Sequence, residues 1–172
     1  MAHSSLLKDY LIELAVAEKL APSLDLACGN GRNGRYLVSQ GLDVVFADIK
    51  PSEDPLPLDK ATFWQVDFEQ PSTSPLTGKS FSSILVFNYL HRPLMASIKQ
   101  AIQPGGLIVY ETFTTEQPQF GRPTNPKFLL KPKELLEHFD DWQVLHYFEG
   151  IVDKEDSSNK KAIAQIVARK PL

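Results

Sequence analysis

The sequence predicts an α/β fold built on a doubly wound, mostly parallel sheet of seven strands with an antiparallel C-terminal strand. Three observations lead to this prediction. Apolar, strand-like segments alternate with helical segments along most of the chain, as in parallel sheets joined by crossover helices. A glycine-rich turn separates the first of these strands from a helix. Finally, two segments rich in β-branched residues flank a polar turn at the end of the chain, which indicates an antiparallel pair.

Four segments have the spacing of apolar residues that is typical of amphipathic helices. Pro22 ends the first of them, and Gly41 is a candidate C-cap for the second. Pro93 stands in the first turn of the third, where its missing N–H is not needed. The expected helices cover residues 5–20, 32–40, 93–102 and 133–139.

Seven further segments are apolar or β-branched enough to form strands. The fourth is almost entirely apolar over 84–87, as expected for a central parallel strand that is covered on both faces. A Pro-Gly-Gly turn leads into the fifth. The loop after the second strand is rich in proline and leaves little room for a helix. The expected strands cover residues 23–27, 42–48, 62–68, 81–90, 107–113, 142–152 and 160–170.

Length and composition indicate one domain over residues 1–172, with no internal repeat or domain boundary. A net charge of -3, from 18 basic and 21 acidic residues, gives no electrostatic signal for a nucleic-acid or membrane partner. No apolar run is long enough to span a bilayer. The first twenty residues carry charges among the apolar positions, unlike a signal peptide. The single cysteine, Cys28, cannot form an internal disulfide. We therefore expect a cytoplasmic protein, as a monomer or homodimer.

The motif most informative about function is the glycine-rich turn, in which Gly29, Gly31 and Gly34 fit the pattern G-x-G-x-x-G between a strand and a helix. Glycine lets a ligand approach the backbone and permits positive φ angles. Amide groups at the start of the following helix can then receive ligand oxygens. Asp48 ends the second strand, 19 residues after Gly29, where a carboxylate can accept hydrogen bonds from both ribose hydroxyls. The sequence thus predicts a nucleotide-type site.

The run Asp25-Leu-Ala-Cys-Gly-Asn-Gly resembles the first motif of class I S-adenosylmethionine-dependent methyltransferases. The resemblance implies that Asp25 helps to hold the methionine amino group and that Asp48 binds the ribose. It also implies that Asp67 accepts from the adenine amine, with Phe68 beside the ring. Within that superfamily, C-G-N-G-R-N is most similar to the small tellurite-resistance methyltransferases, although the downstream segment is not. The implied residues that bind S-adenosyl-L-methionine are Asp25, Ala27, Gly29, Asn30, Gly31, Asp48, Ile49, Asp67, Phe68 and Asn88.

Other roles for these residues stay open at this stage. Asp48 and Asp67 lie at strand ends, where aspartate often only forms a turn or caps a helix. Asp25 alternatively forms a structural hydrogen bond to the turn. Cys28 is interpreted as a packing residue, because no activating neighbour is evident. A dinucleotide oxidoreductase is disfavoured, since the chain lacks a second domain and a second mononucleotide-binding half.

The acceptor is expected beyond the carboxyl ends of the fourth and fifth strands. There, the candidate catalytic residues are Tyr89, His91 as a general base, and Arg92. Tyr110 and Glu111 are candidates for orienting an acceptor.

Arg92 and Arg122 would suit an anionic acceptor, such as the oxyanions tellurite and selenite. As alternatives, His91 is a surface or helix-start residue and the two arginines are solvated. Segment 114–132 contains four prolines and several large apolar residues, so we interpret it as an ordered cover over the acceptor. The alternative is a surface excursion that packs on its own side chains.

These observations predict an S-adenosylmethionine-dependent methyltransferase that acts on a small molecule. A non-catalytic adenosyl-binding module is the alternative, followed by an NAD-linked oxidoreductase. Asn88-Tyr89 has a faint likeness to the N-P-P-Y motif of methyltransferases that modify amino groups, but both prolines and a basic surface are missing. We therefore expect no nucleic-acid substrate. His138 and His146 are expected to be structural, and no spacing of ligands predicts a metal site.

Overall fold

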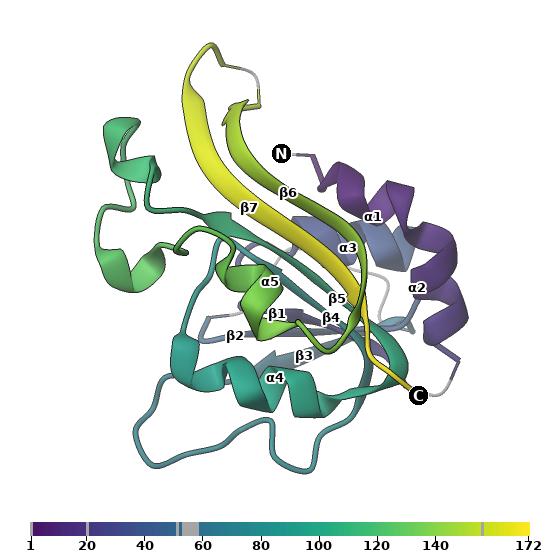
Figure 1. The fold of residues 1–172 in the computed structure, drawn as a ribbon. Coiled ribbons are helices and arrows are strands. Elements are labelled where there is room, and N and C mark those ends of the chain that lie inside the picture. Colours follow the sequence, from purple (N-terminus) through teal and green to yellow (C-terminus); the bar gives the residue numbers. More distant parts are fainter. Residues whose placement is uncertain (1, 20, 51, 53–58, 156) are drawn as a thin grey trace.

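A mixed sheet of seven strands organises the computed structural model, which describes residues 2–19, 21–50, 52, 59–155 and 157–172. Its strands are β1 (Ser23–Leu26), β2 (Val44–Asp48), β3 (Ala61–Gln65), β4 (Phe81–Phe87), β5 (Ile102–Phe113), β6 (Gln143–Asp153) and β7 (Lys160–Arg169). Their order across the sheet is β3-β2-β1-β4-β5-β7-β6 (Figure 1). The predicted fold class, with its parallel strands and antiparallel C-terminal strand, is confirmed.

Strand direction decides where the site lies. β1 pairs in parallel with β2 on one side and β4 on the other, and β5 continues the parallel set. β7 runs antiparallel to both of its neighbours. The carboxyl ends of β1, β2, β4 and β5 therefore meet at one edge, on the left of Figure 1. From β1 the chain adds β2 and β3 on one side of the sheet and then β4 and β5 on the other, so the strand order reverses between β1 and β4. Open α/β sheets bind ligands at such a switch point.

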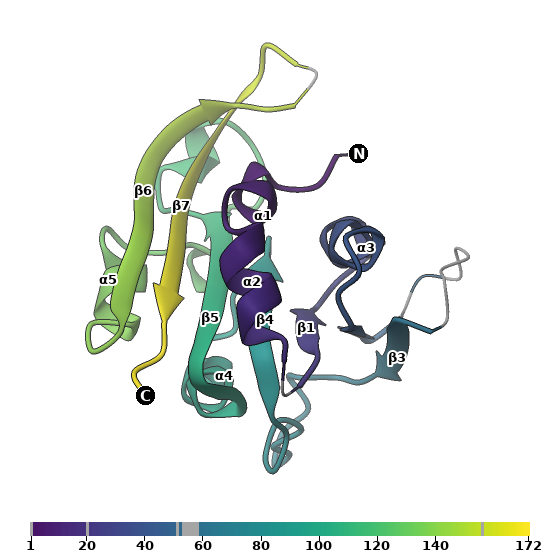
Figure 2. The same cartoon turned by 90° about the vertical axis from the view of Figure 1, so that its right-hand side faces the viewer.

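Helices cover both faces of the sheet (Figure 2). One apolar cluster packs the first three helices against one face of the central strands, and a second packs the last two helices against the opposite face. β4, buried along its whole length, lies between these layers. The helices are α1 (Ser5–Asp9), α2 (Leu11–Ala17), α3 (Arg32–Ser39), α4 (Met95–Ala101) and α5 (Glu134–His138), with short 3₁₀ turns η1 (Arg92–Leu94), η2 (Gln117–Gln119) and η3 (Pro126–Phe128).

Several boundaries differ from the sequence predictions. The helix expected over 5–20 is divided at Tyr10, whose hydroxyl donates to the carbonyl oxygen of Leu145 at 3.1 Å. The third strand ends at Gln65 instead of Phe68, so Asp67 lies in the following turn. β5 begins at Ile102, five residues early, because the Pro-Gly-Gly segment joins the ladder through an irregularity in its register with β4.

Segment 114–132 is anchored at both ends. Its first residue, Thr114, forms an isolated bridge with Leu130, and both are buried. Between them, the side chain of buried Gln117 accepts from the amide of Ala162 and donates to the carbonyl oxygen of Arg122. The segment thus packs along the edge where β4 and β5 end. Among the described helices, none is long and apolar enough to cross a membrane.

Candidate functional site

The turn between β1 and α3 has an unusual backbone. Ala27, Gly29 and Gly31 all have positive φ angles, of 52°, 56° and 77°. Such angles are unfavourable for a residue with a Cβ atom and, outside glycine, often mark functional sites. Apart from Gly29 itself and its two chain neighbours, no atom of the described residues lies within 4 Å of the place where a Cβ of Gly29 would stand. The turn therefore presents bare backbone to open space.

Asp48 connects this turn to the end of β2. One carboxylate oxygen accepts from the amide of Gly29 at 2.9 Å, and the other accepts from the amide of Lys50 at 3.0 Å. The carboxylate is half-buried. The structure thus brings together two residues that the sequence separates by 19 positions, and it places a negative charge beside the open backbone of Gly29.

Asp25 lies beneath the turn instead of facing solvent. Its side chain is buried, and its Oδ2 accepts from the amide of Gly34 at 2.9 Å. Burial raises the pKa of this carboxyl from 3.8 to about 7, although the hydrogen bond from Gly34 opposes the rise. The structural alternative for Asp25, a hydrogen bond that ties the turn to α3, therefore describes its geometry, and in this geometry the carboxyl is not presented to a ligand.

This burial predicts an unusual pH dependence. Because the folded-state pKa lies above the unfolded-state value, the folded protein holds the proton more tightly between pH 4 and 7, so the contribution of Asp25 to stability falls as pH rises across that range. Asp25→Asn should flatten the slope of the melting temperature against pH between about 5 and 7. Thermal unfolding at a series of pH values measures it. An unchanged slope would mean that Asp25 does not titrate in this range.

The remaining cofactor-binding residues of the sequence prediction lie along the same edge. Ile49, directly after Asp48, is 62% exposed. Asp67 is also exposed, and its Oδ1 accepts from the amide of Glu69, so it forms the turn after β3. Phe68 is buried against Trp64 in an edge-to-face contact, and it also lines a hollow of about 300 Å³. Its contact with an adenine ring stays a prediction.

The ends of β4 and β5 hold one another in place. Asn88 follows β4 with a φ of 57°, and its amide donates to the carbonyl oxygen of Glu111. The hydroxyl of Tyr110 donates to the carbonyl oxygen of Tyr89 at 2.8 Å. The hydroxyl of Tyr89 in turn donates to Glu69 at 3.2 Å. Burial and the neighbouring Glu69 carboxylate raise the pKa of Tyr89, which keeps its phenol protonated.

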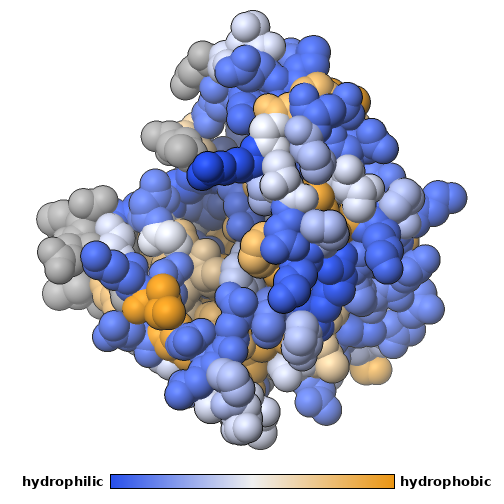
Figure 3. All heavy atoms as spheres, turned by 90° about the vertical axis from the view of Figure 1, so that its left-hand side faces the viewer, coloured by the Kyte–Doolittle hydropathy of each residue, from blue (hydrophilic) through white to orange (hydrophobic). Residues whose placement is uncertain are grey.

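A cavity of about 640 Å³ opens between these strand ends and segment 114–132. Figure 3 faces this edge and shows hydrophobic atoms exposed among hydrophilic ones. The walls of the cavity come from the end of β4, the end of β5, the turn after β3 and the tip of segment 114–132. The lining residues are Glu69, Asn88, Tyr89, Leu90, Thr112, Phe113, Arg122, Pro123, Thr124, Asn125 and Phe128.

Of the predicted catalytic residues, only Tyr89 lines this cavity. His91 lines a neighbouring hollow of about 300 Å³ beside Phe68 and Pro93. Its Nδ1 lies 3.5 Å from Oε1 of Glu69, the residue that also receives the Tyr89 hydroxyl. Glu69 therefore links both side chains. Glu69 is not among the residues predicted from the sequence, because nothing in its local pattern indicates contacts with residues about twenty positions away.

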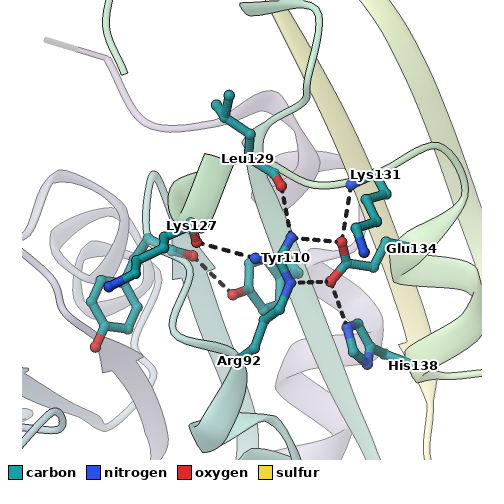
Figure 4. Close-up of polar contacts among 8 residues, drawn as sticks. Arg92, Tyr110, Lys127, Leu129, Lys131, Glu134 and His138 are labelled. Carbon is teal, nitrogen blue, oxygen red and sulfur yellow. Dashed lines mark hydrogen bonds and ion pairs between the residues drawn. The ribbon is translucent and has the colours of Figure 1, made fainter. Parts of the chain in front are cut away.

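Arg92 is committed to a structural cluster (Figure 4). Its guanidinium donates twice to Glu134, at 2.8 Å each, and also to the carbonyl oxygens of Lys127 and Leu129. His138 contacts the same carboxylate at 2.9 Å. Because these partners engage all three guanidinium nitrogens, the predicted role of Arg92 in binding an anionic acceptor does not match this geometry. Instead, Arg92 attaches the segment that forms the cavity wall to η1 and α5.

Other candidate groups lie away from the cavity. The buried carboxylate of Glu111 accepts from Gln165 at 2.6 Å, and Gln165 also contacts His146. Burial raises the pKa of the Cys28 thiol to about 12, which disfavours a nucleophilic thiolate. Among the described residues, no group of three potential ligands is arranged to hold a metal ion.

Known proteins resemble this chain in structure and in sequence. No protein-family model matches the chain. The crystal structure of TehB from Haemophilus influenzae superposes with a TM-score of 0.65 over 96% of this chain and 65% of that one, at 21% identity. The chain has the fold of the class I S-adenosylmethionine-dependent methyltransferases. Strand order, the glycine turn and the acid ending β2 all agree with this methyltransferase fold.

Sequence similarity points the same way. The chain is 29% identical, over 168 residues, to a probable S-adenosyl-L-methionine-dependent methyltransferase, TehB of H. influenzae, covering 86% of this chain and 56% of that one. It is 28% identical over 166 residues to Hemagglutinin 1 of Eikenella corrodens, with 87% and 54% covered. The chain thus spans about half the length of these relatives. Another methyltransferase fold, the 1,6-didemethyltoxoflavin-N1-methyltransferase of Burkholderia thailandensis with bound 1,6-didemethyltoxoflavin and S-adenosylhomocysteine, has a TM-score of 0.65 at 16% identity, covering 99% of this chain and 80% of that one.

Proposed function

We propose that this chain is an S-adenosylmethionine-dependent methyltransferase that acts on a small-molecule acceptor. One observation carries the proposal. The open glycine turn with its Asp48 carboxylate shares one sheet edge with a cavity of about 640 Å³ that is large enough for an organic acceptor. Sequence similarity to TehB, and structural similarity to a methyltransferase with bound 1,6-didemethyltoxoflavin and S-adenosylhomocysteine, support it.

The residues at the turn fit the cofactor. Gly29 leaves open space where a side chain would stand, so a ligand can lie against its backbone. Asp48 offers carboxylate oxygens beside that space for ribose hydroxyls. Exposed Ile49 and Asp67, on the next strand ends, offer an apolar contact and an acceptor for the adenine portion. We propose that Ala27, Asn30, Gly31 and Asn88 complete the site through backbone and side-chain polar groups.

The protein's contribution to methyl transfer is positioning. S-adenosylmethionine supplies a methyl group that its sulfonium already activates, so no covalent help from the protein is required. We propose that Asn88 and Tyr89 orient the acceptor at the mouth of the sheet, and that segment 114–132 covers it and excludes water. Where the acceptor nucleophile carries a proton, the Glu69 carboxylate is the base within the cavity, and Nδ1 of His91 lies 3.5 Å from its Oε1.

Two finer expectations belong to this proposal. The half-buried, unreactive Cys28 is compatible with a cytoplasmic enzyme, and a monomer or homodimer without nucleic-acid partners fits the modest net charge. Two arginines together would suit an oxyanion acceptor such as tellurite. Arg92 is engaged by Glu134, and among the described residues that line the cavity Arg122 is the one cation.

Calorimetry with S-adenosylhomocysteine tests the cofactor proposal. We expect binding, and we expect Asp48→Ala to weaken it by about 1 to 2 kcal/mol, the magnitude of lost charged hydrogen bonds. Asp43→Ala is the matched control, because it removes the same charge near the opposite end of β2 and should leave affinity unchanged. No binding of the wild-type chain at millimolar concentration would refute the proposal. Binding without any methylated product across an acceptor panel would favour a non-catalytic module.

A further inference from the structure

The volume and the lining of the cavity beside Asn88 indicate which class of acceptor it can hold, and this inference rests on the proposed function. A four-atom oxyanion occupies on the order of 100 Å³, at about 30 Å³ for each water-sized atom. The cavity, at about 640 Å³, is several times larger and falls in the range that holds drug-sized organic molecules. An oxyanion alone would leave most of this space filled with water and in poor contact with the protein.

The walls of the cavity favour an aromatic occupant. Leu90, Phe113 and Pro123 contribute apolar surface from the loop after β4, the end of β5 and the segment tip. Phe128, in η3, is 44% exposed although it is a large aromatic residue, so its ring is available to a ligand. Aromatic rings pack well against flat conjugated molecules, in offset or edge-to-face contacts. The arrangement therefore suits a planar body more than a small hydrated ion.

Two charged residues of the lining, Arg122 and Glu69, determine which end of the occupant lies at which end of the cavity. Arg122 is exposed at the segment tip, and within the described parts of the chain no hydrogen bond or ion pair engages its guanidinium. Glu69, on the turn after β3, places a carboxylate beside Tyr89. A negative group on the occupant is attracted by Arg122 and repelled by Glu69, so it lies at the Arg122 end. The nucleophilic end then lies toward Asn88, nearest the glycine turn.

We propose that the methyl acceptor is a planar aromatic or heteroaromatic molecule of about two fused rings that carries one anionic group recognised by Arg122. Its rings lie between Phe113 and Phe128, and the atom to be methylated lies near Asn88 and Tyr89.

Titration calorimetry on the full chain, with and without S-adenosylhomocysteine, tests this assignment with three probes: 2-naphthoate, uncharged 2-naphthamide and sodium tellurite. We expect both naphthalene probes to bind and Phe128→Ala to weaken both. Arg122→Gln should weaken 2-naphthoate roughly fivefold, as expected for a partly exposed guanidinium–carboxylate pair, and change 2-naphthamide less than about twofold. Lys127→Gln is the matched control, since it removes a neighbouring charge that is outside the lining, and it should change neither affinity.

The assignment is overturned if neither naphthalene probe binds at millimolar concentration, whether or not tellurite binds, or if Arg122→Gln and Lys127→Gln have equal effects on 2-naphthoate. Failure of the cofactor proposal is a separate result. If S-adenosylhomocysteine binds and the naphthalene probes do not, the proposed function stands and the acceptor class is wrong. If the probes bind and S-adenosylhomocysteine does not, the cofactor proposal is wrong, and the cavity binds aromatic anions without accepting a methyl group for them.

Discussion

Glu134→Ala is expected to lower the free energy of unfolding by about 2 kcal/mol, less than the roughly 3 to 5 kcal/mol that follows removal of one partner of a fully buried ion pair, because the Arg92 side chain is 34% exposed and solvent screens its charge. The side chain of Glu134 is 8% exposed, and it accepts from the Arg92 guanidinium, the Lys131 amide and His138. Removing it leaves the Arg92 guanidinium with the carbonyl oxygens of Lys127 and Leu129 and with solvent as its remaining partners. Urea unfolding measures the change, and Glu137→Ala is the control, because it removes an exposed carboxylate from the same helix.

The same cluster predicts a response to acid. Burial alone would raise the pKa of Glu134, but the hydrogen bonds from Arg92, Lys131 and His138 lower it from 4.5 to about 2. Because the folded-state pKa is depressed, the stabilisation is complete above pH 4.5 and is lost as pH falls toward 2. Glu134→Gln should lose stability at neutral pH and show a shallower decline through that window. If wild type and Glu134→Gln decline in parallel, the ion pair does not contribute.

Variants of Arg92 distinguish the contribution of its positive charge to stability from the contribution of its hydrogen-bond geometry. Arg92→Lys keeps a positive charge but cannot donate simultaneously to Glu134 and to the carbonyl oxygens of Lys127 and Leu129. We expect it to retain less than half of the stabilisation. A double-mutant cycle between Arg92→Ala and Glu134→Ala should give a coupling energy of about 1 to 3 kcal/mol. A coupling near zero would show that the two side chains act independently.

The second large effect is expected at Gly34, the third glycine of the turn motif. A Cβ on Gly34 would lie 2.5 Å from the ring of Phe46 and 2.8 Å from Oδ2 of Asp25. Phe46 is almost completely buried and stacked against Phe63, so its ring cannot move away freely. Gly34→Ala should therefore destabilise the protein by about 2 kcal/mol, since overpacking costs about 1 to 3 kcal/mol and the better helix propensity of alanine offsets part of it.

Two further variants test that explanation. Phe46→Leu makes space for the methyl group, so the Gly34→Ala penalty should be smaller in that background. Gly78→Ala is the control, because its Cβ would meet no atom within 4 Å and its φ of 75° costs only about 1 kcal/mol for left-handed backbone. An equal penalty for Gly34→Ala with and without Phe46→Leu would contradict steric overlap as the cause.

The predictions from sequence succeeded where local chemistry and periodicity govern the outcome. The short apolar run 84–87 has the pattern of a central parallel strand covered on both faces, and the structure buries β4 along its whole length. The set of seven strands and their mostly parallel arrangement were predicted in this way, whereas the order of the strands comes from the structure. Boundaries were less predictable, because partners elsewhere decide them. β5 extends back to Ile102 only because β4 lies alongside to receive its hydrogen bonds.

In the candidate site, too, some features could be predicted from the sequence and others depend on the tertiary structure. The sequence by itself determined the glycine turn and the acid at the end of β2, since the spacing of Gly29 and Asp48 follows from one strand-turn-helix-strand unit. Only the tertiary structure decided that Arg92 binds Glu134, 42 positions away, and that Glu69 joins Tyr89 and His91. A side chain's role depends on which partners surround it in space. For residues on loops those partners come from distant segments, and no local pattern in the sequence encodes them.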